Sequence, residues 1–194
     1  MSTVPLFTDE AWQLPSKGKA AMFSLIVGEC GIFTIFVAAY IVYMGRSLSG
    51  PTPSILDVPV FNTICLLSSS LTIWLAERAI EHGQIRKFGA FWGLTIALGL
   101  IFIVGTGVEW HTLIYRDGLT ISTNLFGTTF YSLVGLHATH VLVGLLGLSI
   151  IMIFTLLGKV RQEHAHRIQV FSLYWHFVDA VWVVVFTVVY LVGR

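Results

Sequence analysis

The sequence is poor in charge and in cysteine. Only 11% of its 194 residues are Asp, Glu, Lys or Arg, which is less than half of the roughly 25% usual in a water-soluble domain. The 11 basic and 10 acidic residues leave a net charge of +1, so no basic surface for nucleic acid is expected. Cys30 and Cys65 show no paired spacing. This excludes a disulfide framework, a zinc knuckle and a Cys-x-x-Cys-His haem attachment site.

Hydrophobic residues make up 56% of the chain, and the mean hydropathy is +0.84. A helix needs roughly 20 apolar residues to cross about 30 Å of hydrocarbon. Five stretches reach that length. They predict an all-α integral membrane bundle of five transmembrane helices, at about residues 20–44, 58–80, 88–111, 125–157 and 170–193.

The five spans form one transmembrane domain, residues 20–194, which follows a polar N-terminal lead, residues 1–19. The lead has no apolar core, so it is not expected to be a cleaved signal peptide. The short connections leave no room for a soluble domain.

The distribution of Lys and Arg predicts the orientation of the bundle, because cytoplasmic segments carry the excess. The N-terminus is expected in the cytoplasm and the C-terminus outside. Eight basic residues lie on the predicted cytoplasmic side and three on the other: Lys17, Lys19, Arg78, Arg86, Lys87, Lys159, Arg161 and Arg167 against Arg46, Arg116 and Arg194.

Polar residues inside the predicted spans are the best candidates for functional groups. A charge at the membrane centre costs about 2.5–3.5 kcal/mol on insertion scales, so such residues are rare in spans without a role. Glu29 and Asp179 each lie roughly nine residues into a span, which places both near mid-membrane. His137 and His140 share one helix face, and so do His176 and Asp179, because each pair is one turn apart. An inward rotation of these faces could gather Glu29, His140, His176 and Asp179 into one buried network.

Three interpretations of that network stay open. The polar groups could fix the register of the helices through hydrogen bonds, or they could carry protons. They could also bind metal or haem through His137, His140 and His176. The last is the least favoured, because one helical turn cannot supply both axial ligands of a haem, and no cysteine or further carboxylate completes a tetrahedral set. No metal site is therefore predicted.

Basic residues at the predicted cytoplasmic ends could hold anionic lipid headgroups. Ordinary positive-inside bias explains them equally well. The candidates are Arg78, Arg86, Lys87, Arg161 and Arg167.

Residues 174–182, with the sequence YWHFVDAVW, closely resemble the last helix of subunit III of the haem-copper terminal oxidases, whose pattern is Y/F-W-H-F-x-D-x-V-W. Residues 126–131 (FGTTFY) and 135–141 (GLHATHV) are similar to that family's G-S-T-F…G-x-H-x-x-H-V helix. Residues 28–33 (GECGIF) match its S-E-x-x-F-F segment. In that segment Glu29 takes the place of the family's carbodiimide-reactive carboxyl.

The resemblance runs from about residue 20 to the C-terminus and implies a short, five-helix bacterial subunit III. Such a chain has no redox centre and no catalytic residues of its own. It packs against subunit I, with subunit II and a small subunit IV in the same complex, binds phospholipid, and sustains stability and proton uptake. Haem and copper lie in the partner subunits, which reduce O2 to water and pump protons across the bacterial plasma membrane.

Departures from the family pattern leave alternatives open. Longer members have two further helices at the start. Gln169 stands where the mitochondrial type has Glu, and residues 167–173 are closer to the quinol-oxidase branch. Glu29 is instead typical of the cytochrome c branch, so the electron donor is undecided. The other hypotheses are an accessory subunit of a nitric oxide reductase, and a stand-alone proton or ion carrier that uses Glu29 and Asp179.

Overall fold

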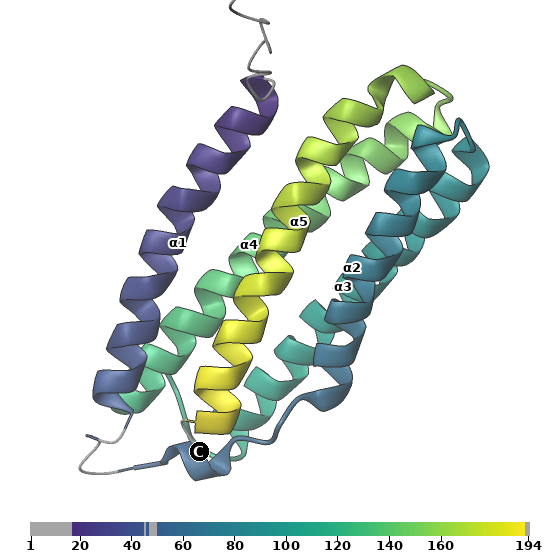
Figure 1. Ribbon diagram of the computed structural model, residues 1–194. Helices are drawn as coiled ribbons and strands as arrows, with labels where there is room; N and C mark the ends of the chain where they lie inside the picture. Colours follow the sequence, from purple (N-terminus) through teal and green to yellow (C-terminus); the bar gives the residue numbers. More distant parts are fainter. Residues whose placement is uncertain (1–16, 45, 47–49, 193–194) are drawn as a thin grey trace, which may run out of the picture.

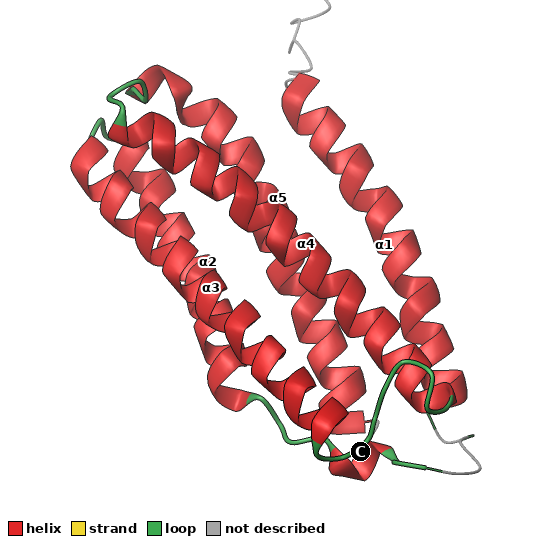
Figure 2. Cartoon of the chain, turned by 180° about the vertical axis from the view of Figure 1, so that it is seen from behind, coloured by secondary structure: helices red, strands yellow, loops and turns green. Residues whose placement is uncertain are grey.

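The structure is a computed structural model that describes residues 17–44, 46 and 50–192. Five long helices dominate the described part, which contains no strand (Figures 1 and 2). All five have the length and hydropathy needed to cross a membrane, so the predicted all-α, five-helix class is confirmed. The helices are α1 (Lys17–Tyr43), α2 (Val60–Glu81), α3 (Ile85–Tyr115), α4 (Leu125–Leu156) and α5 (Ala165–Phe186), which continues as a π-helical turn, η3 (Thr187–Val192).

Most of the predicted N-terminal lead, residues 1–16, lies outside the described residues, as do residues 193–194. Helix α5 begins at Ala165, five residues before the predicted span. The predicted span is limited to residues without charge, so it has to begin after Arg167. A helix itself can continue through charged residues, because its backbone hydrogen bonds do not depend on apolar side chains.

The start of α1 and the α2–α3 and α4–α5 connections lie at the same end of the bundle (Figure 1). Two of these turns are tight because a glycine with positive φ ends each preceding helix, Gly83 at 69° and Gly158 at 68°. After each glycine, a backbone N–H bonds back to a carbonyl five residues earlier, Gln84 to Ala79 at 2.8 Å and Lys159 to Phe154 at 3.0 Å. Left-handed glycines are the usual solution at such ends. The assignment of this end to the cytoplasm remains a prediction from the charge count.

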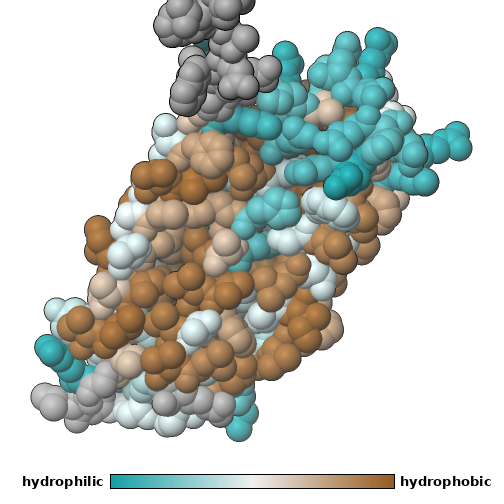
Figure 3. Space-filling model, in the orientation of Figure 1, coloured by the Kyte–Doolittle hydropathy of each residue, from teal (hydrophilic) through white to brown (hydrophobic). Residues whose placement is uncertain are grey.

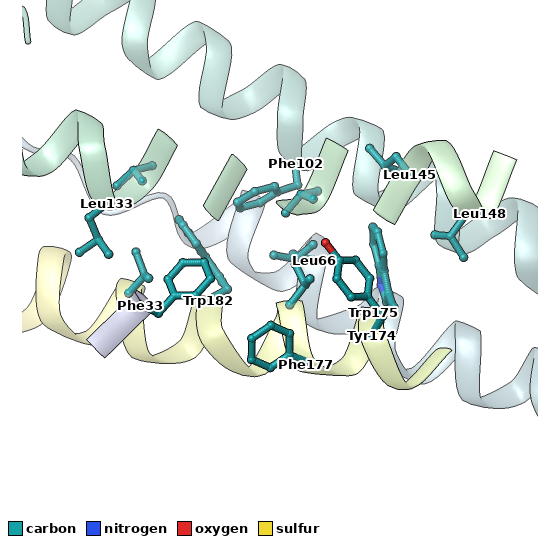
Figure 4. Packing of buried hydrophobic residues seen from close by; sticks show 14 of the residues in the cluster. Phe33, Leu66, Phe102, Leu133, Leu145, Leu148, Tyr174, Trp175, Phe177 and Trp182 are labelled. Carbon is teal, nitrogen blue, oxygen red and sulfur yellow. The ribbon is translucent and has the colours of Figure 1, made fainter. Parts of the chain in front are cut away.

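Helix α5 packs against α1, α2 and α4 and contributes two of the three fully buried tryptophans of the described residues, Trp175 and Trp182 (Figure 4). Two glycines make room for Trp175. A Cβ atom on Gly99 of α3 would lie 2.9 Å from its ring, and a Cβ on Gly144 of α4 would lie 2.8 Å from it. The indole of Trp175 on α5 therefore packs closely against both α3 and α4.

The outer surface of the bundle is apolar (Figure 3). Val27, Val104 and Leu146 are 70%, 62% and 66% exposed. Helix α1 buries only Phe33 and Tyr40 among its described side chains. A surface of this kind is stable in hydrocarbon rather than in water.

Candidate functional site

Glu29 and His140 form a direct pair between α1 and α4. The Oε2 atom of Glu29 lies 3.0 Å from Nε2 of His140, and their side chains are only 25% and 14% exposed. The other ring nitrogen of His140, Nδ1, lies 2.8 Å from the carbonyl oxygen of Leu136. A carbonyl oxygen can only accept, so Nδ1 carries a hydrogen.

That assignment fixes how many protons the pair holds. With Nδ1 as a donor, Nε2 either accepts a hydrogen from a protonated Glu29 or donates one to an ionised Glu29. In both cases one proton lies between Oε2 and Nε2. The Glu29–His140 pair can therefore exchange one proton as a unit.

The pair also joins three helices. The hydroxyl of Tyr174 on α5 donates to the backbone carbonyl of His140 at 3.1 Å, and the ring of Phe33 on α1 lies 5.0 Å from the imidazole. Because α1 has few other buried side chains, this contact is a main attachment of α1 to the bundle.

Asp179 has a separate set of partners on α2. Its Oδ2 atom accepts a hydrogen bond from Ser70 at short range. The Ser69 hydroxyl, which donates to the Leu66 carbonyl at 2.6 Å, lies 3.5 Å from the same oxygen. His176 lies one turn before Asp179, and its Nδ1 atom is 3.2 Å from Ser70 Oγ. Since the single hydroxyl hydrogen of Ser70 goes to Asp179, His176 Nδ1 donates to Ser70. Trp175 Nε1 donates to Ser69 Oγ at 2.8 Å.

The structure therefore divides the four predicted network residues into two sites. Glu29 pairs with His140 between α1 and α4, and His176 and Asp179 meet Ser70 between α2 and α5. No hydrogen bond connects the two sites within the described residues.

His137 belongs to neither site. Its side chain is completely buried, with ring centroids 5.8 Å from Phe102 and 4.9 Å from Trp182. Neither ring nitrogen has a hydrogen-bond partner among the described residues.

The predicted lipid-contacting residues are all exposed near one end of the bundle: Arg78, Arg86, Lys87, Arg161 and Arg167. Arg167 lines a cavity of about 410 Å³ together with Lys159, His164 and apolar side chains that include Phe154 and Phe171. A lining that combines Lys159 and Arg167 with apolar side chains suits an anionic amphiphile.

Sequence reasoning did not assign roles to Ser69, Ser70 or the partner of Glu109. The run of three serines, residues 68–70, was a detectable signal, but it did not show which serines face α5. Glu109 accepts a hydrogen bond from Tyr190 at 2.8 Å, near the opposite end of the bundle. No sequence spacing connects these two residues, which are far apart in the chain.

The side chains described do not fit haem or copper. No group of three His, Cys, Asp or Glu residues within the described ranges gathers as a metal site. The two nitrogens of His140 are already engaged by Glu29 and Leu136, and His137 is enclosed by aromatic rings.

These features define a multi-pass helical membrane protein whose interior holds one acid–imidazole pair and one serine-linked His–Asp cluster. The sequence profile described as cytochrome c oxidase subunit III matches residues 21–194. The chain therefore belongs to the cytochrome c oxidase subunit III family, as its resemblance in sequence predicted, and membership implies assembly with other oxidase subunits.

Similar curated proteins include subunits of both donor types. The cytochrome c oxidase subunit 3 of Alkalihalophilus pseudofirmus is 36% identical over 184 residues, covering 93% of this chain and 89% of the relative. That of Bacillus sp. strain PS3 is 34% identical, covering 98% and 94%. The cytochrome bo(3) ubiquinol oxidase subunit 3 of Pseudomonas aeruginosa is 35% identical, covering 87% and 81%.

Proposed function

We propose that this chain is the non-catalytic subunit III of a bacterial haem-copper oxygen reductase in the plasma membrane. The complex reduces O2 to water with electrons from cytochrome c or a quinol and pumps protons. The chain contacts mainly subunit I, with subunit II and a small subunit IV nearby, and those partner subunits hold the haem and copper. Family membership over residues 21–194 carries the proposal, and the names of the relatives favour it over a nitric oxide reductase subunit or a stand-alone carrier.

Within the complex, the Glu29–His140 pair has two roles. It holds α1 against α4 through the 3.0 Å contact, and its one shared proton is available for exchange during proton uptake. The other residues that we propose to be proton-linked are His137 on α4 and His176 and Asp179 on α5.

Phospholipid is the other expected ligand. The cavity lined by Lys159 and Arg167 supports this role because anionic headgroups are attracted to clustered cations at a membrane surface. The other exposed basic residues of the same end, Arg78, Arg86, Lys87 and Arg161, add to the attraction.

Deleting the gene for this chain tests the proposal. The oxidase from the deletion strain should start with near-normal O2 consumption and then lose activity within fewer turnovers than the wild-type complex. Supplying the wild-type gene should restore the lifetime. An unchanged lifetime and unchanged proton uptake without the chain would contradict the proposal.

A further inference from the structure

A groove runs along α5 from the α2–α3 end of the bundle toward its middle, with α1 and α2 as its walls. Its volume is about 370 Å³, and six residues line it: Lys19 and Phe23 from α1, Glu77 from α2, and Gln169, Leu173 and His176 from α5. The hydrophilic surface at the end of the bundle extends into the hydrophobic band over these helices (Figure 3). Polar residues are ordinary near the helix ends, but a groove that reaches inward to His176 is unexpected on a surface that faces only lipid.

The polar groups of the groove continue inward along one stripe of α5. Gln169, Ser172, His176 and Asp179 follow one another at intervals of three or four residues, so they share a helix face. At 1.5 Å per residue, His176 lies about 16 Å and Asp179 about 21 Å from the start of α5. At the entrance, Gln169 Nε2 donates to Glu81 Oε1 at 2.6 Å. At the inner end, His176 bonds to Ser70 and Ser70 to Asp179.

One atom on this stripe is buried without a partner. Asp179 Oδ1 has no hydrogen bond among the described residues, and Asp179 is only 3% exposed. The buried hydroxyl of Ser172 has the half-buried carboxyl of Glu77 beside it. Unsatisfied polar atoms cost several kcal/mol each in hydrocarbon, so an arrangement of this kind needs another source of hydrogen bonds.

Water is the occupant that fits these observations. A water molecule takes about 30 Å³ of liquid volume, so a groove of about 370 Å³ holds roughly a dozen. The lining offers donors and acceptors on three helices, with Lys19 on α1, Glu77 on α2, and Gln169 and His176 on α5. A lipid acyl chain would fill the same volume but would offer no hydrogen bonds to the polar lining or to Asp179 Oδ1.

We propose that this groove is a water-filled inlet that opens at the α2–α3 end of the bundle and reaches the Ser70–Asp179 pair. Through it, water and the protons that water carries gain access to a carboxyl group near mid-membrane. The inlet is separate from the Glu29–His140 pair and does not rest on the proposed oxidase function, because its test measures access rather than O2 consumption.

Thiol labelling of the assembled complex tests the inlet. In a background with Cys30→Ala and Cys65→Ala, Ser70→Cys and Ser68→Cys form a matched pair two residues apart on α2. Ser68 is exposed whereas Ser70 is half-buried, so exposure alone predicts faster labelling at position 68. A membrane-impermeant cationic methanethiosulfonate reagent reacts with thiolates, which form in water and not in hydrocarbon. The inlet predicts about tenfold faster labelling at position 70.

A blocking substitution provides the second arm. Leu173→Trp should fill the groove and reduce the labelling of Ser70→Cys about tenfold, while leaving Ser68→Cys unchanged. Leu71→Trp, at an exposed position on α2 (59% exposed), is the control and should have no effect. Equal rates at positions 68 and 70, no labelling at position 70, or labelling that Leu173→Trp does not slow would each overturn the inlet.

Discussion

The link between α1 and α4 can be tested by comparing two substitutions of Glu29. Glu29→Ala removes the partner that His140 Nε2 has among the described residues, because this nitrogen lies 3.0 Å from Glu29 Oε2. A buried acceptor left without a partner costs about 1–3 kcal/mol. Glu29→Gln should cost less than about 1 kcal/mol, because the Gln amide can donate to Nε2 while Nδ1 keeps its bond to Leu136.

Thermal dissociation of the purified complex measures the difference. In a domain of 150–250 residues, 1 kcal/mol shifts the midpoint by roughly 2–4 °C, so Glu29→Ala should lower the temperature at which this chain leaves the complex by roughly 5 °C. Glu29→Gln should stay within about 2 °C of wild type and alter proton uptake or turnover lifetime instead. Cys30→Ala, at the exposed neighbouring position, is the control. Equal shifts for Ala and Gln, or no shift for Ala, would refute the proposed hydrogen-bond link.

Two further substitutions follow from the packing. Gly144→Ala places a Cβ atom 2.8 Å from Trp175 and should destabilise the bundle by about 1–3 kcal/mol through overpacking. Gly107→Ala is the control, because its Cβ meets nothing within 4 Å, and it should be neutral or slightly stabilising. Thermal unfolding measures both, and equal midpoints for the two variants would contradict the close contact. Asp179→Asn disturbs the Ser70 and His176 hydrogen bonds, so it should lower the yield of assembled complex while leaving activity per haem near wild type. A wild-type yield with lost proton pumping would count against this expectation.

The sequence predicts where the helices lie in the chain better than it predicts which helices contact one another. Runs of apolar residues locate all five spans, since hydrocarbon thickness and helical rise determine the length required. Helix ends are less predictable, as α5 shows. Its first turns contain Arg167 and lie where the apolar criterion no longer applies.

The polar sites show why a motif alone is insufficient. One-turn spacing correctly places His176 and Asp179 on one face, but the rotation of each helix decides which neighbour that face meets. Packing of Trp175 against Gly99 and Gly144 helps to set that rotation. With this rotation, Asp179 faces the serines of α2, and Glu29 on α1 pairs with His140 on α4.

The serine run shows the same limitation. Successive residues of a helix point about 100° apart, so residues 68–70 face three directions. Ser69 and Ser70 face α5, and Ser68 faces outward. Only the packing of α2 against α5 distinguishes them.

Purification of the tagged chain from its own membranes tests the central claim most directly. The account predicts that the chain copurifies with a haem-containing oxidase subunit in a 1:1 ratio, as measured by mass spectrometry and the haem absorption spectrum. After dissociation, the haem band should remain entirely with the partner. A haem or copper centre that stays with the isolated chain, or a chain that purifies without any oxidase subunit, would contradict the account.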